Sequence, residues 1–388
     1  MEVVQIHNIV NAITSEILGE DGVITEDLSN IVDVGKSLEN LDQGYDNFVR
    51  ALPDRIGKVI FVDRVYSGRA PSVLMDAFEY GAIVEKISTV LPEATENETW
   101  ELEDGYSYDP NIFYKSQVEL KFFRNKVTFE IPLSIADRQV KTAFTGPTEM
   151  NAFISMLYNA VRNSMTVKMD SLVARTINNF IGETFKNDIP GADYSDQTTN
   201  RAVNLLKLYN DGVDEADQLT AAEAIKDGRF IRFASLTMAN YLDRMKLLST
   251  LFNIEGKARF TPDEKLHIIM LSEFKNAADI YLQSDTFHDE YTKLPNAESV
   301  AYWQGPGEDY SFSNTSKINV KVSSDGTEIE AGGILAVMFD RDALGVTNLD
   351  RRVTSNYNPK AEFTNTWNKF DAGYFNDMAE QFVVFFVA

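Results

Sequence analysis

Histidines and paired carboxylates are the side chains of this sequence best suited to do chemistry. There are three histidines, His7, His267 and His288, and no two of them have the spacing of metal ligands. His267 lies within an apolar run, where a histidine is more often a satisfied core residue than a catalytic base. Asp340 and Asp342 could act as a glycosidase pair, but such pairs arise by chance among 59 acidic residues. We therefore assign no catalytic residue.

Motifs for cofactors, metals and nucleotides are also missing from the sequence. It contains no G-x-S-x-G, P-loop or G-x-G-x-x-G motif. Zero cysteines exclude disulfides, thiolate metal sites and thiol nucleophiles. The acidic stretch Glu101–Asp109 could attract a divalent cation, but it lacks the alternating acids and the closing glutamate of a calcium loop, so a solvated hairpin end is favoured. We expect a protein that is not an enzyme and that needs no cofactor or metal.

The net charge limits the partners of the chain. Its 388 residues carry a formal charge of -23, which repels nucleic acid phosphates and anionic lipids. There is no apolar run long enough to span a bilayer and no basic-then-apolar leader at Met1. We expect a protein made in the cytoplasm that binds neither membranes nor a specific DNA sequence.

The strongest structural signal is a long amphipathic helix from Gly146 to about Lys186. Gly146 is a suitable N-cap and Pro147 suits the first helical position. At about 1.5 Å per residue the helix would be roughly 50–60 Å long, so it needs a layer packed along its whole length. Its apolar residues recur at steps of three and four, which places them on one stripe: Met150, Phe153, Ile154, Leu157, Tyr158, Val161, Met165, Met169, Leu172, Val173, Ile177, Phe180 and Ile181.

Shorter elements precede this helix. Two brief helices, around Ile9–Ile17 and Glu26–Leu41, have too few apolar residues to form a core alone and must lie on another element. Three strands are then expected, at Ile56–Val62, Ala82–Val90 and Tyr114–Ile131. Glu93–Asp109 has seven acids and no Lys or Arg, so the last two strands describe a hairpin with an acidic tip. Because such a hairpin is marginally stable alone, it must lie on this chain or on another copy.

Strands and helices alternate after the long helix, which favours an α/β module. A helix capped by Ser235 or Thr237 should run through Phe252, and Ser272 should cap another through Leu282. A polar hairpin is expected at Val353–Lys369. The other expected strands are Phe230–Phe233, Leu266–Leu271, Ile318–Val322, Ile334–Phe339 and Phe382–Val387.

Several motifs give the chain a family resemblance. They are Val32-x-Val34-Gly35, then Asp46-x-Phe48-Val49-x-x-Leu52-x-Asp54-Arg55-Ile56-Gly57, and the aromatic-rich return Tyr114–Phe129 leading to Ala143-Phe144. With the order of elements, they resemble the major capsid proteins of tailed bacteriophages, which have the Hong Kong 97-type fold. The capsid proteins of small protein-primed podophages of Gram-positive hosts are the most similar.

The resemblance implies an α+β Hong Kong 97-type capsid fold with an N-terminal arm, an extended β-hairpin loop, a long spine helix and an α/β axial domain. The implied parts are the arm (1–55), a linking strand (56–79), the extended loop (80–131), the peripheral domain with the spine helix (132–204), the axial domain (205–345), and the return to the peripheral domain with the C-terminal strand (346–388).

The resemblance also implies a function. The chain would form pentamers and hexamers of an icosahedral phage shell around double-stranded DNA, with a separate scaffolding protein and a portal. The hairpin would lie across the adjacent subunit, and its aromatic residues would contact that subunit: Trp100, Tyr106, Tyr108, Phe113 and Tyr114. One relative cross-links a lysine to an asparagine beside a glutamate, but Lys86, Lys115 and Lys121 of the hairpin have no partner motif here, so we expect no cross-link.

Two other functions stay open from the sequence. The same fold could form an encapsulin compartment that binds cargo-protein peptides, which a neighbouring cargo gene would indicate. An acidic intracellular hydrolase is the alternative of another class, although no particular carboxylate pair supports it.

Overall fold

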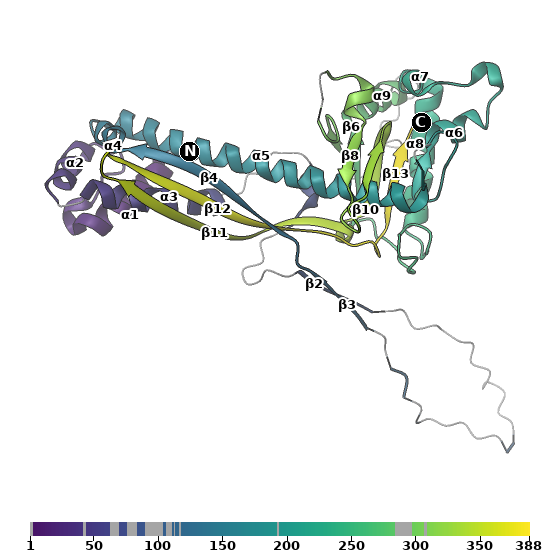
Figure 1. Cartoon of the computed structure of the whole chain (residues 1–388), viewed down its shortest axis with the longest axis horizontal. Coiled ribbons are helices and arrows are strands. Elements are labelled where there is room, and N and C mark those ends of the chain that lie inside the picture. The colour runs from purple at the N-terminus through teal and green to yellow at the C-terminus, as the bar shows by residue number, and fades with distance from the viewer. Residues whose placement is uncertain are drawn as a thin grey trace.

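A 42-residue helix, α5 (Pro147–Asp188), joins the two parts of the chain in the computed structural model (Figure 1). Gly146 is its N-cap and Pro147 its first residue, as predicted. The structure describes residues 3–41, 44–62, 70–75, 84–89, 104–105, 111, 113–115, 118–191, 194–283, 297–305 and 309–388. At about 1.5 Å per residue α5 is about 63 Å long, and a layer lies along it as the sequence requires.

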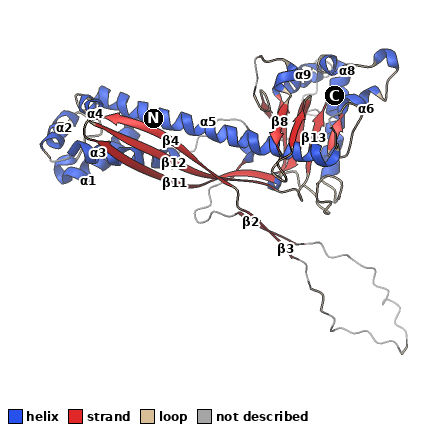
Figure 2. Cartoon of the chain, viewed as in Figure 1, coloured by secondary structure: helices blue, strands red, loops and turns tan. Residues whose placement is uncertain are grey.

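The elongated part is a long antiparallel sheet beside α5. Its strand order is β1-β11-β12-β4, and β1 pairs with β11 in parallel. The sheet follows the first two thirds of α5 (Figure 2). The strands are β1 (Leu74–Met75), β4 (Lys126–Ala136), β11 (Leu344–Asn358) and β12 (Phe363–Asn376).

Short helices close the far end of the elongated part (Figure 1). They bury a common apolar cluster against the N-terminal half of α5 and against β4 and β12, so the first segment lies on another element as predicted. Gly35 is required here, because a Cβ at that position would stand 2.8 Å from Cβ of Phe144. The helices are α1 (Val3–Leu18), α2 (Ile31–Asn40), α3 (Gly44–Val62) and α4 (Asp137–Ala143).

The compact part is built on a five-stranded sheet of order β5-β13-β10-β6-β7. Its strands are β5 (Ala202–Asn204), β6 (Leu266–Leu271), β7 (Ala297–Val300), β10 (Ile334–Asp340) and β13 (Phe382–Phe386). The helices around it are α6 (Leu205–Asn210), α7 (Ala221–Ala224), α8 (Gly228–Met245) and α9 (Ser272–Gln283). A two-stranded ribbon, β8 (Ile318–Lys321) and β9 (Glu328–Ala331), lies on α5, with α10 (Phe312–Thr315) before it.

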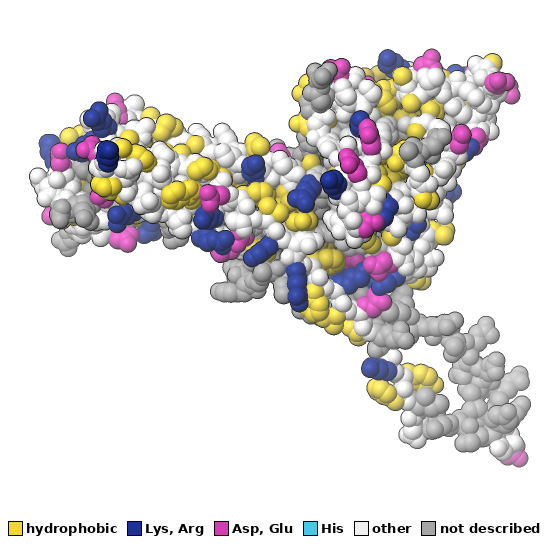
Figure 3. Space-filling view, in the orientation of Figure 1, with side chains coloured by type: hydrophobic (Ala, Val, Ile, Leu, Met, Phe, Trp, Pro, Cys, Tyr) yellow, Lys and Arg dark blue, Asp and Glu magenta, His cyan; other side chains and the backbone are white. Residues whose placement is uncertain are grey.

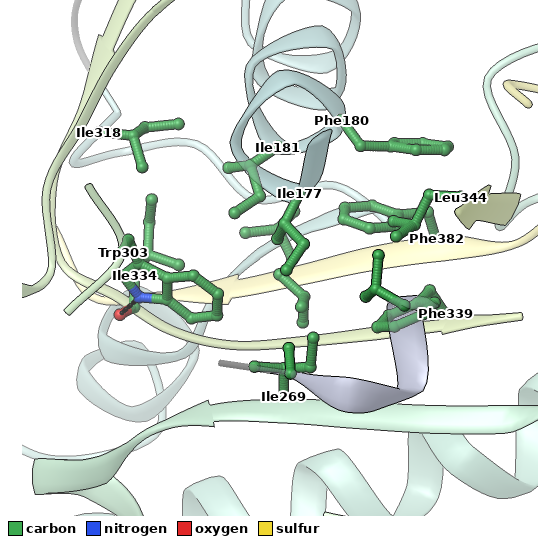
Figure 4. Close-up of a cluster of buried hydrophobic side chains, with 14 of the residues drawn as sticks. Ile177, Phe180, Ile181, Ile269, Trp303, Ile318, Ile334, Phe339, Leu344 and Phe382 are labelled. Carbon is green, nitrogen blue, oxygen red and sulfur yellow. Dashed lines mark hydrogen bonds between the residues drawn. The ribbon is translucent and has the colours of Figure 1, made fainter. Parts of the chain in front are cut away.

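The core is continuous from the sheet of the compact part into α5 (Figure 4). Phe180 of α5 stacks on Phe382 of β13, with ring centroids 4.1 Å apart. The Trp303 indole, 2% exposed, donates a hydrogen bond of 2.8 Å to the Ile334 carbonyl. The apolar C-terminal strand therefore lies inside a sheet, between β10 and β5.

Most of the predicted elements are confirmed, and the fold is the predicted mixture of helix and sheet. Three strand predictions are wrong. Ile56–Val62 is the second half of α3, and Phe230–Phe233 is the first turn of α8. The α8 cap is Asp227, which accepts from the amides of Arg229 and Phe230, so neither Ser235 nor Thr237 caps that helix.

The third wrong strand is Tyr114–Ile131, which the structure breaks at Arg124–Asn125. Its first half, β3 (Val118–Phe123), pairs with β2 (Val84–Thr89) to form the projecting hairpin. Its second half, β4, pairs with β12 in the long sheet. The less exposed positions are odd-numbered on both sides of the break, whereas the apolar row lies at even-numbered positions in β3 and at odd-numbered positions in β4.

Candidate assembly interface

The hairpin β2–β3 projects from the rest of the described chain, which we call the body, on the side of β11 and β12 (Figure 1). Its strands are antiparallel, with Val84 opposite Phe123 and Thr89 opposite Val118. Successive side chains of a strand point to opposite faces. Two different surfaces result on β3, one polar and turned to the body, the other apolar.

The apolar face of β3 is uncovered. Val118, Leu120 and Phe122 are 53%, 49% and 52% exposed, and hydrophobic side chains lie open to view along the hairpin (Figure 3). Phe113 and Tyr114, which precede this strand, are 86% and 83% exposed. An exposed apolar row on a two-stranded hairpin indicates a surface for another molecule.

Two of the predicted contact residues can thus be placed. Phe113 and Tyr114 are exposed on the segment that enters β3. Trp100, Tyr106 and Tyr108 lie outside the described residues. The apolar row of β3 was foreseen as part of an alternating strand, but the sequence did not show that it faces away from the body.

The polar face of β3 is bound to the body by ion pairs. Lys121 donates to Asp377 at 2.7 Å and to Glu255 at 2.6 Å. Glu119 pairs with Lys257 of the same body loop. The Phe123 ring packs on Phe375 at a centroid distance of 5.0 Å.

Lys86 of β2 is bound to the same place. Its ammonium group lies 2.8 Å from Asp377 and 2.7 Å from Glu380, and it donates to the Asp342 carbonyl at 3.2 Å. Asp377 therefore bridges both strands of the hairpin. We call Lys86, Lys121, Glu255, Asp377 and Glu380 the hairpin anchor.

Electrostatics favour the charged forms of Asp377 and Lys86 in the hairpin anchor. Burial raises the pKa of Asp377, but the charges of Lys86 and Lys121 outweigh it and hold that pKa below its usual value. Burial lowers the pKa of Lys86, and here too the partners Asp377 and Glu380 prevail, so the Lys86 pKa is raised. No pattern in the sequence indicates these contacts, since Lys86 and Asp377 are 291 positions apart.

The residues first considered for chemistry have structural partners. Asp340 is buried and accepts from the Asp342 amide, while the Asp342 carboxylate pairs with Lys265 at 2.7 Å. His267 lies in β6 with its ring stacked on Phe339, and burial lowers its pKa. Within the described ranges, no cluster of three or more His, Cys, Asp or Glu side chains is placed to hold a metal ion. No helix in the same ranges has the length and apolarity to cross a membrane.

Comparison with known proteins decides the family. A sequence model of the Phi29-like phage major capsid proteins matches residues 10–386 of the chain. The chain belongs to this family. The resemblance seen in the sequence motifs is thereby confirmed.

The major capsid protein of Bacillus phage GA-1 is 25% identical over 168 residues, a match that covers 40% of this chain and 31% of that relative.

Solved phage structures show a loose likeness of fold. A chain in the capsid structure of Staphylococcus phage Andhra has a TM-score of 0.46 at 10% identity and 84% and 86% coverage of the two chains. A chain in the structure of the head fiber and inner core protein of bacteriophage P68 has a TM-score of 0.49 at 9% identity, again with 84% and 86% coverage. These scores lie below 0.5, so the family assignment rests on the sequence match.

Proposed function

We propose that this chain is the repeating subunit of a phage head. Many copies form pentamers and hexamers of an icosahedral shell that encloses double-stranded DNA, in a virion assembled in the host cytoplasm. The family match supports this role over an encapsulin compartment and over a hydrolase.

The uncovered apolar face of β3 carries this proposal. The hairpin anchor fixes the direction in which β2 and β3 leave the body, and Val118, Leu120 and Phe122 then have no cover among the described residues. A second copy of the chain supplies that cover. The polar contacts described above hold elements of the fold together. The proposed role is therefore structural and needs no catalytic step.

The parts of the Hong Kong 97-type fold are proposed with the same bounds as before. Residues 1–55 are the arm, 56–79 the link, 80–131 the extended loop, 132–204 the peripheral domain with α5 as its spine, 205–345 the axial domain and 346–388 the return. The packing of α1–α3 on α5 and the separate sheet of the compact part support this division. A scaffolding protein and a portal are the proposed assembly partners.

Electron microscopy of the purified chain tests the proposal. We expect capsomers or closed shells, either alone or after co-expression with a scaffolding protein. A chain that stays monomeric by light scattering in both conditions would contradict a shell function.

A further inference from the structure

A groove lies on α5 on the side opposite its core-facing stripe. Its main hollow, of about 620 Å³, is bounded by α5, by β8 and by the segment 302–305. A smaller hollow of about 230 Å³ shares Arg175 and Asn179 with it and reaches Asn376 of β12. We call the two together the α5 groove.

Side-chain amides line the α5 groove. They come from five different elements or loops: Asn125, Asn178, Asn179, Gln304, Asn319 and Asn376. Asn178 is 3% exposed and donates to the Trp303 carbonyl at 3.0 Å, while its own carbonyl oxygen has no hydrogen-bond partner in the described structure. A buried acceptor without a donor is costly, so this oxygen favours a ligand that brings an N–H group, as an extended peptide does.

Two cations of the α5 groove are available to a ligand. Within the described ranges neither Arg175 nor Lys321 has a carboxylate partner, and Arg175 lies over the Tyr374 ring at 5.5 Å. Of the two acids lining the groove, Glu183 accepts from the amide and hydroxyl of Ser324, and Asp170 lies on the α5 wall. Amides with two free cations suit an extended peptide that carries carboxylates.

We propose that the α5 groove binds the acidic stretch Glu93–Asp109 of a second copy of the chain. This inference rests on the proposed function, because it requires copies to meet. The stretch has seven acids and no Lys or Arg, which complements Arg175 and Lys321. The hairpin that carries it leaves the body on the side of β11 and β12, away from α5 (Figure 1), so the occupant comes from a neighbour.

Cross-linking between two different copies tests the groove. The chain has no cysteine, so copies with Ser171→Cys, an exposed position that lines the groove, can be mixed with Asp104→Cys copies and treated with a short bismaleimide. We expect a covalent dimer on a denaturing gel. Lys168→Cys is the matched control, because Lys168 is exposed on α5 but does not line the groove. We expect about tenfold less dimer from this control, and equal or undetectable yields from both would overturn the inference.

Charge reversal gives a second measurement with the same cross-link as its readout. In the Ser171→Cys background, Arg175→Glu should lower the dimer yield several-fold, and Glu101→Lys with Glu103→Lys in the Asp104→Cys copy should restore it. An unchanged yield would overturn the inference. If the chain forms shells but no cross-linked dimer appears, the groove contact is wrong and the proposed shell function stands. If the dimer appears but no shells form, the groove contact stands and the proposed shell function is wrong.

Discussion

Asp377 is the residue on which the direction of the hairpin depends. It is 2% exposed and accepts from Lys86 of β2 and from Lys121 of β3, at 2.8 and 2.7 Å. The two lysines are visible in the sequence as charges on a hairpin, but their partner lies beyond β12. A buried acid needs a cation, but the burial of Asp377 is seen only in the structure.

The variant Asp377→Asn should loosen the hairpin without unfolding the sheets. Removing one partner of a buried pair costs about 3–5 kcal/mol, and we expect the low end because both lysines keep some contact with water. Urea denaturation measures the loss. Asp350→Asn is the control: its carboxylate is exposed and 3.5 Å from Arg352, so its effect should stay below about 0.5 kcal/mol. Equal losses of unfolding free energy for the two variants would contradict the stabilising role of Asp377 in the hairpin anchor.

The contribution of Asp377 should depend on pH in a defined direction. Its pKa in the folded chain lies below the usual 3.8, so the stabilisation is present above that value and is lost as pH falls through the folded pKa. The Lys86 pKa is raised above 10.5, so its contribution is present below 10.5 and lost at higher pH. The difference in unfolding free energy between wild type and Asp377→Asn should be constant from about pH 5 to 9 and shrink below about pH 4. A constant difference at pH 3 would contradict this.

At the scale of elements, the long periodic pattern of α5 and the apolar runs of three strands were predicted well, whereas two other short apolar runs were not. The stripe of α5 continues for many turns, and the apolar runs of β6, β10 and β13 are bounded by polar residues. Ile56–Val62 and Phe230–Phe233 are apolar runs of strand length, for which period alone does not separate strand from helix. For Phe230 the deciding contact is the Asp227 cap, and Ile56 contributes to the cluster beside α5.

The shift of the apolar row by one position between β3 and β4 was the element-scale feature that most affected the interface. Both strands alternate, and the sequence alone joins them into one strand. Odd-numbered side chains face inward in both strands, so Val127 and Phe129 pack against the core while Leu120 and Phe122 face outward. The place where the predicted strand breaks depends on where β12 and β2 pair, which are contacts over long sequence separations.

A core substitution in α5 tests its role as the common support of both parts. Ile177 is 1% exposed in the cluster that joins α5 to the five-stranded sheet (Figure 4). Ile177→Ala should cost about 2–5 kcal/mol of unfolding free energy through lost burial and a cavity. Val167→Ala, at 63% exposure on the same helix, should change it by less than about 0.5 kcal/mol. Comparable costs would show that α5 does not carry the core.

At the scale of the whole molecule, folding and assembly should use different surfaces. The three buried clusters stabilise the single chain, whereas Leu120 and Phe122 are half exposed and contribute little to them. The double variant Leu120→Thr with Phe122→Thr should keep the wild-type unfolding curve within about 0.5 kcal/mol, because exposed positions tolerate exchange and threonine suits a strand. Its shell yield by electron microscopy should fall at least tenfold, because the apolar area available to a second copy is lost.

Glu130→Thr is the control on β4: its carboxylate is about half exposed beside Lys369, and its loss should leave shell yield unchanged. Normal shells from the double variant would show that copies meet elsewhere, and a lowered unfolding free energy would show that β3 belongs to the core of its own chain.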